Sequence, residues 1–193
     1  MRSTAALRAA WNEWACNTDR MTRTAFGPAR VHVAAFTREL WAVLAAVMER
    51  HNYSIRPADT WGYNCRAITG GSELSLHAFG IALDVNATTN PYVRTPDGRQ
   101  VRFSRRRSQR ARADDVRAGR ADTDMTRKMI ADIRAIQTAE GRAVFAWGGD
   151  FQSVKDAMHF QIDLTPDELR AGLAQLVAEG PATTARNFQR SRS

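Results

Sequence analysis

Two histidines, each close to an aspartate, are the residues of this sequence best suited to chemistry. Asp84 follows His77 by seven positions, and Asp156 precedes His159 by three. Imidazole nitrogens and carboxylate oxygens bind zinc, and catalytic zinc sites commonly use three protein ligands and leave the fourth position to water. His77, Asp84 and His159 would supply such a ligand set, although this spacing also arises by chance.

Asp156 and Arg66 could complete a hydrolytic site. Residues three apart on a strand face opposite sides, so we expect Asp156 in the bend before the strand, leaning over the metal, rather than as a fourth ligand. There it could take a proton from a zinc-activated water and pass it to a leaving amine, a role worth about 10²- to 10⁴-fold in rate. Arg66 could stabilise the oxyanion that forms as the carbonyl is attacked.

Short strands with alternating apolar and polar residues must position these side chains. Strands are expected over 61–67, 81–86, 143–147 and 158–163. In three of them, one face is apolar and the other carries Arg66, Asp84 or His159. An antiparallel sheet often turns a polar face to water, but arginine, aspartate, histidine and asparagine here favour the floor of a cleft. Neighbouring strands would bring Asp84 and His159 together.

Four helices are expected around these strands. Apolar residues recur at helical spacing over 5–15, over a main core helix at 31–50, and over 124–138 behind a Thr123 cap. The last helix begins at a capping box of Thr165 and Glu168 and would end at Gly180–Pro181. His32 would begin the core helix and His51 would end it. This order predicts an α+β fold, with helices on the apolar face of a small antiparallel sheet and the zinc cleft on its polar face.

Length and composition indicate one globular domain. The chain has 193 residues, of which 44% are hydrophobic and 25% charged, so we expect a domain over 1–180 followed by a tail or linker over 181–193. No apolar stretch is long enough for a membrane span, and the N-terminus lacks the apolar centre of a signal peptide. Cys16 and Cys65 are interpreted as packing residues, which would suit a reducing compartment.

Two blocks of the sequence resemble the D-alanyl-D-alanine carboxypeptidase family of zinc peptidases. The first block consists of WGYNCRAITGGS at 61–72 and SLHAFGIALDVN at 75–86, and the second of WGGDF at 147–151 and DAMHFQ at 156–161. The likeness extends over about residues 31–162. Within the family, the sequence is most similar to the L-alanyl-D-glutamate endopeptidase branch, which includes phage endolysins.

The resemblance implies a role for each residue singled out above. His77, Asp84 and His159 would be the ligands of one zinc per chain, Asp156 the acid–base, and Arg66 the arginine that contacts substrate and transition state. The substrate would be a peptidoglycan stem peptide. Glutamate is usual at the position of Asp156 in the carboxypeptidase branch, so the aspartate favours an endopeptidase.

Several alternatives stay open at this point. Ser75 could support the turn that carries His77 or simply form it, and Trp147 could wall the cleft or fill the core. The chain could instead be a D-Ala-D-Ala carboxypeptidase, or a non-catalytic module that binds cell wall or nucleic acid. As an endolysin, it would be a monomer made in the host cytoplasm without a signal peptide, acting on the bacterial wall after release.

Most of the net charge of +8 lies in one segment. Ten arginines and three aspartates fall between Arg94 and Arg120. A nucleic-acid-binding surface usually combines basic residues from several elements with aromatic ones, whereas this segment offers only Phe103, so nucleic acid is disfavoured. The segment is either a basic arm that draws the enzyme to anionic cell-wall polymers or stem-peptide carboxylates, or a solvated, partly disordered insertion.

Overall fold

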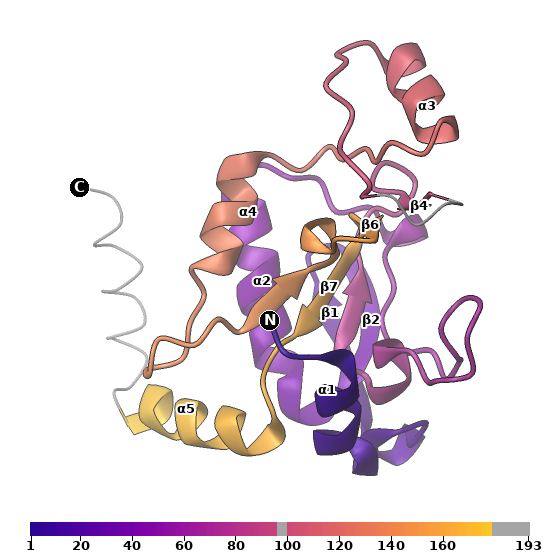
Figure 1. The fold of residues 1–193 in the computed structure, drawn as a ribbon. Helices are drawn as coiled ribbons and strands as arrows, with labels where there is room; N and C mark the ends of the chain where they lie inside the picture. Colours follow the sequence, from indigo (N-terminus) through magenta and orange to yellow (C-terminus); the bar gives the residue numbers. More distant parts are fainter. Residues whose placement is uncertain (96–99, 179–193) are drawn as a thin grey trace.

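The computed structural model describes residues 1–95 and 100–178, and within these ranges the chain has the α+β fold that the sequence predicts (Figure 1). The helices are α1 (Thr4–Ala10), α2 (Arg38–Arg50), α3 (Gln109–Arg117), α4 (Arg127–Arg134) and α5 (Pro166–Ala178). The strands are β1 (Met21–Phe26), β2 (Ala29–Ala34), β3 (Ala82–Asp84), β4 (Tyr92–Arg94), β5 (Phe145–Trp147), β6 (Val154–Asp156) and β7 (His159–Ile162). None of the helices in the described ranges is long and apolar enough to cross a membrane.

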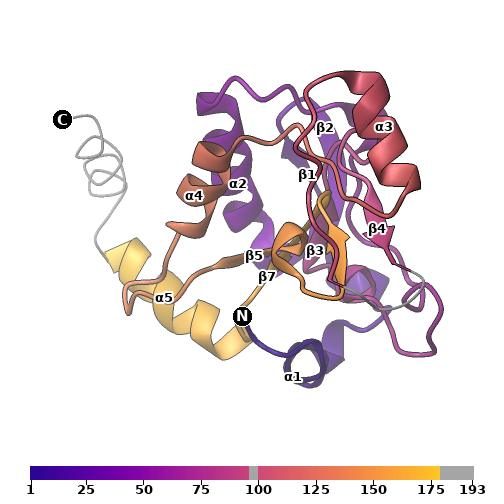
Figure 2. The same ribbon diagram turned by 45° about the horizontal axis from the view of Figure 1, so that its top comes forward.

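A three-stranded antiparallel sheet of order β3-β7-β5 forms the centre of the molecule. Its register places Asp84 of β3 directly opposite His159 of β7, which confirms that neighbouring strands bring these two residues together. Both faces of β3 and β7 are buried. The helices α2 and α4 lie side by side next to this sheet (Figure 2).

Residues 61–67 do not form the regular strand that their alternation predicts. Trp61 makes an isolated bridge with Asp84, and Tyr63 N–H donates to the carbonyl oxygen of His32 at 2.7 Å. The segment therefore joins β2 to β3 for three residues and then leaves the sheet. A Cβ atom on Gly62 would lie 2.2 Å from the His32 oxygen, so only glycine permits this close approach.

The helix predicted over 31–50 is correct only from Arg38 onwards. Residues 29–34 instead form β2, which pairs with β1 in an antiparallel hairpin. Val31 and Val33 are buried and His32 between them is exposed, the period of a strand. His32 thus lies in a strand and does not begin a helix, whereas His51 follows the last residue of α2 as predicted and pairs with Asp132 at 2.7 Å.

In two further helices, the capping residues can be compared with those predicted from the sequence. The predicted helix over 124–138 is shorter, and its cap is Thr126, whose hydroxyl accepts from Met129 N–H, rather than Thr123. The capping box of α5 is confirmed, because Thr165 and Glu168 each bond the other's backbone N–H, at 3.2 and 2.9 Å. The predicted stop at Gly180–Pro181 and the tail over 181–193 lie outside the described residues.

The described part of the arginine-rich segment is folded, and its helix has no buried residue, which fits a solvated insertion over these residues. It forms α3, which projects from the top of the molecule in Figure 1. Beneath it, Val93, Val101 and Ala121 make a small apolar cluster separate from the main core. Arg112 pairs with Asp122 at 2.8 Å.

The two cysteines form a disulfide, so their interpretation as packing residues is wrong. Cys16 and Cys65 are 49 positions apart in sequence, and their Cα atoms lie 5.0 Å apart. Cys16 N–H also donates to the carbonyl oxygen of Ala78 at 2.8 Å. The disulfide therefore fastens the 61–67 segment to the N-terminal part of the chain.

Candidate metal centre

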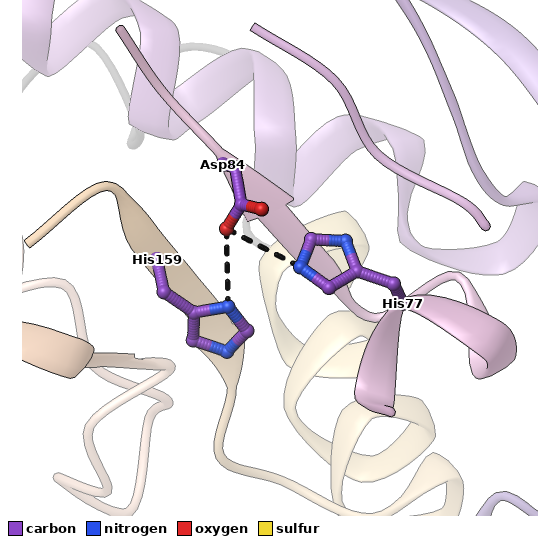
Figure 3. Close-up of side chains that lie close together, drawn as sticks. All are labelled: His77, Asp84 and His159. Carbon is purple, nitrogen blue, oxygen red and sulfur yellow. Dashed lines mark hydrogen bonds and ion pairs between the residues drawn. The ribbon is translucent and has the colours of Figure 1, made fainter. Parts of the chain in front are cut away.

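The structure brings His77, Asp84 and His159 together where the last residue of β3 lies opposite the first residue of β7. One ligand atom from each residue lies within 4.8 Å of the others, and the three residues are 2%, 5% and 7% exposed. Figure 3 shows both imidazole rings turned towards the same carboxylate. Three buried ligand atoms that converge on one point are what a zinc ion requires of a protein.

His77 is positioned by a turn of 3₁₀ helix over Leu76–Phe79. Its Nδ1–H donates to the carbonyl oxygen of Gly62 at 2.8 Å, and its Nε2 lies 3.3 Å from Asp84 Oδ1. Ser75 is the N-cap of this turn, and its hydroxyl accepts from His77 N–H at 3.4 Å. Ser75 therefore supports the turn, and the two alternatives considered for it describe one role.

His159 is held in the same way by a residue of its own strand. Its Nε2 lies 3.2 Å from Gln161 Oε1, and its Nδ1 lies 3.3 Å from Asp84 Oδ1. Residues two apart on a strand share a face, which is why Gln161 reaches the ring. The sequence analysis did not single out Gln161, although an amide two positions after a ligand histidine was a signal that could have found it.

In both histidines, the nitrogen turned away from Asp84 faces a carbonyl-type oxygen, which only accepts hydrogen bonds. That nitrogen therefore carries a proton, and the other one lies beside a carboxylate oxygen, where it presents a lone pair to a metal once it is deprotonated. With those two nitrogens deprotonated, the two lone pairs and the carboxylate around one point would suit a cation between them. The donor set thus fits a zinc ion, with His77 Nε2, Asp84 Oδ1 and His159 Nδ1 as its ligand atoms.

Without a bound cation, the imidazoles and the carboxylate of the cluster shift one another's pKa. Burial acts to raise the pKa of Asp84, but the hydrogen bonds and charges of His159 and His77 outweigh it and hold the pKa well below its usual range. Burial acts to lower the pKa of His159, but the hydrogen bond to Asp84 and the charge of Asp156 raise it instead. The second oxygen of Asp84 accepts from Trp61 Nε1–H at 3.1 Å.

Asp156 lies beside the cluster with one oxygen unsatisfied. It ends β6, opposite Tyr92 of β4, so it belongs to a strand and not to the bend that we expected. Its Oδ1 is buried and has no hydrogen-bond partner among the described residues. Burial raises the pKa of Asp156; the charge of Asp84 adds to this effect, and that of His159 opposes it. A buried carboxyl oxygen without a partner is costly unless a ligand completes the site.

Arg66 is placed differently from the expectation, and Trp147 takes the second of the two places considered for it. Arg66 is exposed and donates to the carbonyl oxygen of Ala67 at 3.2 Å, and it acts on Asp156 only through its charge, which lowers that pKa. Trp147 is buried in the core, donates to the carbonyl oxygen of Ala157 at 2.8 Å and stacks on Phe103. Trp147 therefore packs and does not form an open wall.

Comparison with known proteins gives one family. Residues 69–162, just under half of the chain, match the family model described as D-alanyl-D-alanine carboxypeptidase. The matched segment contains His77, Asp84, Asp156 and His159, and the match supports a peptidase of this family. Comparison with curated proteins and with solved structures finds no match.

Proposed function

We propose that this protein is a zinc-dependent peptidase that hydrolyses peptide bonds in peptidoglycan stem peptides. The observation that carries the proposal is the orientation of the two histidines, each of which donates one ring N–H to an oxygen of the protein and turns its other ring nitrogen towards the same oxygen of Asp84. The match of residues 69–162 to a peptidase family supports it.

Each residue of the site has a distinct task in this proposal. His77, Asp84 and His159 would hold one zinc, which when bound would supply a nucleophile at neutral pH by lowering the pKa of water and would polarise the substrate carbonyl. Asp156 accepts the proton of the attacking water through its unsatisfied oxygen and delivers it to the leaving amine nitrogen. Arg66 turns from its exposed position towards the carbonyl oxygen and stabilises the negative charge that develops there.

The proposal also specifies which peptide bond of the stem peptide is cut. An aspartate at position 156 favours an L-Ala-D-Glu endopeptidase of the phage endolysin type, in line with the resemblance of its sequence blocks. A D-Ala-D-Ala carboxypeptidase is the second candidate, and the description of the matching family favours it.

The partners and place of action follow from the substrate. The enzyme acts as a monomer on the bacterial wall after release from the host cytoplasm in which it is made. A disulfide between Cys16 and Cys65 suits an oxidising place of action. The arginine-rich segment provides attraction to anionic wall polymers.

Digestion of purified peptidoglycan, with the products identified by mass spectrometry, tests the proposal. New L-Ala carboxyl termini and D-Glu amino termini are expected. Release of free D-Ala would instead identify the carboxypeptidase, and intact peptides after incubation with the zinc-loaded protein would contradict both.

Two variants separate chemistry from metal binding. His159→Ala is expected to lose the bound zinc, whereas Asp156→Ala is expected to keep it and lose about 10²-fold or more of the hydrolysis rate. Metal content and rate are measured on the same samples. Near-normal hydrolysis by Asp156→Ala would show that another group moves the proton, and an unchanged zinc content in His159→Ala would disprove the ligand set.

A further inference from the structure

A strongly cationic pocket lies beneath α3, on the far side of β6 from the metal cluster. Its volume is about 760 Å³. It is lined by the cationic side chains of Arg102, Arg105, Arg106, Arg120, Arg127 and Lys155. Among the described residues that line it, Asp115 is the only carboxylate.

The charges of the pocket are not balanced within the described residues. Asp115 accepts from Ser104 Oγ–H at 2.6 Å and lies 3.7 Å from Arg106 Nε. In residues 1–95 and 100–178, no carboxylate pairs with Arg102, Arg105, Arg120 or Arg127. Like charges that gather without counter-charges repel one another, so the pocket is suited to an anionic ligand.

Other arginines of the same segment show a contrasting pattern. Arg112 pairs with Asp122 at 2.8 Å, and Arg117 pairs with Asp114 within α3. Neither of these arginines lines the pocket. The segment therefore contains arginines engaged in the fold and a separate group left unpaired around one cavity.

The pocket and the metal cluster are separate sites joined by β6. Lys155 lines the pocket, and the next residue, Asp156, lies beside the metal ligands, as expected when successive strand residues point to opposite sides. Phe103 of the pocket stacks on Trp147 with the ring centres 5.7 Å apart. A polymer held in the pocket would thus be fixed close to the catalytic residues without occupying their places.

We propose that this pocket binds phosphate groups of a phosphodiester polymer attached to the bacterial cell wall. Guanidinium groups bind phosphate oxygens through paired, charge-assisted hydrogen bonds, and a cavity of this volume has room for more than one such group. The choice of a wall polymer rests on the proposed function.

A nucleic acid is the less favoured polyanion. Proteins that hold single strands usually stack bases on aromatic rings. Of the described residues that line the pocket, Phe103 is the only aromatic one, and its ring is already stacked on Trp147 and lies 5.9 Å from the ammonium of Lys155.

Cosedimentation with purified cell walls tests the proposal, with the walls used either intact or stripped of their phosphate polymer by acid. The parent protein is expected to bind intact walls about tenfold or more tightly than stripped walls at low salt, and the difference is expected to shrink as salt rises. The variant Arg105→Gln/Arg120→Gln should lose most of that difference. The control Arg107→Gln/Arg110→Gln removes the same charge from the same segment outside the pocket and should keep it.

Each outcome of these binding experiments either supports or overturns a part of the proposal. If both variants lost the preference for intact walls equally, the effect would be one of general charge, and the pocket would be rejected as the binding site. Equal binding of the parent to intact and stripped walls would overturn phosphate as the ligand, and tighter binding to DNA than to intact walls, lost in the pocket variant alone, would replace the wall polymer with nucleic acid. Thermal unfolding of both variants excludes misfolding. Cosedimentation measures binding independently of hydrolysis. A protein that bound walls in a phosphate-dependent way but cut no peptide would therefore support the proposed pocket and contradict the proposed function.

Discussion

The two histidines are oriented before any metal arrives. Each ring uses one nitrogen to bond an oxygen of the protein, Gly62 O for His77 and Gln161 Oε1 for His159. Such outer partners fix which nitrogen carries the proton and where the lone pair points. Because these contacts exist in the folded chain, metal binding need not order the side chains.

Removal of the outer partner of His159 should weaken the metal site while leaving its ligands in place. Gln161→Leu keeps the buried volume but removes the oxygen, and we expect zinc affinity to fall about 10- to 100-fold. Competition with a chromophoric chelator measures the affinity. Gln152→Leu, at an exposed position in the same part of the chain, is the matched control. Equal affinities in the two variants would show that Gln161 does not orient the ring.

Residue types and spacing could predict the ligands but not their supports. Asp84 and His159 stood out because they are ligand types on expected strand faces, and His77 because it precedes Asp84 by seven positions, in the turn expected before that strand. The carbonyl of Gly62 carries no signal in the sequence, since every residue has one. The position of Arg66 was inferred from strand alternation. This inference was wrong because the segment leaves the sheet after three residues.

At the scale of elements, the site depends on how closely the turn after β5 approaches β6 and β7. A Cβ atom on Gly148 would lie 2.4 Å from the Asp156 carbonyl oxygen and 3.1 Å from His159 Cβ. This turn therefore packs directly against the backbone of the proposed acid–base and one ligand. Only a residue without a side chain allows that packing.

Gly148→Ala should therefore disturb stability and metal binding together. Overpacking of this kind costs about 1–3 kcal/mol, and the displaced backbone carries His159, so we expect a lower denaturation midpoint and weaker zinc binding. Gly71→Ala is the control, because its Cβ would meet only the exposed side chain of Ile68. Urea unfolding and zinc titration of both variants measure the effect. A Gly148→Ala protein as stable as Gly71→Ala would contradict the close packing.

Elements with local signals were predictable, and those that depend on distant pairing were not. The start of α5 was correct because Thr165 and Glu168 satisfy each other's N–H groups within one turn. Residues 31–34 were misassigned to a helix because Val31 fits either period, and β2 exists only through its pairing with β1.

At the scale of the whole molecule, the disulfide joins the N-terminal region to the segment that surrounds the metal ligands. Asn64 N–H, next to Cys65, donates to the carbonyl oxygen of His77 at 3.2 Å, and Ser75 N–H donates to that of Arg66 at 3.0 Å. Two cysteines allow only one pairing, but whether it forms depends on a distance that the fold alone sets.

Loss of the disulfide should lower stability and impair catalysis more than metal binding. Its loop-entropy contribution for a 49-residue separation is about 4 kcal/mol, so Cys16→Ser/Cys65→Ser should unfold at markedly lower urea concentration. The zinc ligands lie outside the tethered segment, whereas Arg66 follows Cys65 directly, so we expect the variant to keep its zinc and lose hydrolysis rate. Parent protein in excess reductant should behave like the variant, and the variant itself should not respond to reductant. If reduction left both the unfolding midpoint and the rate of the parent unchanged, the disulfide would have no part in holding this segment.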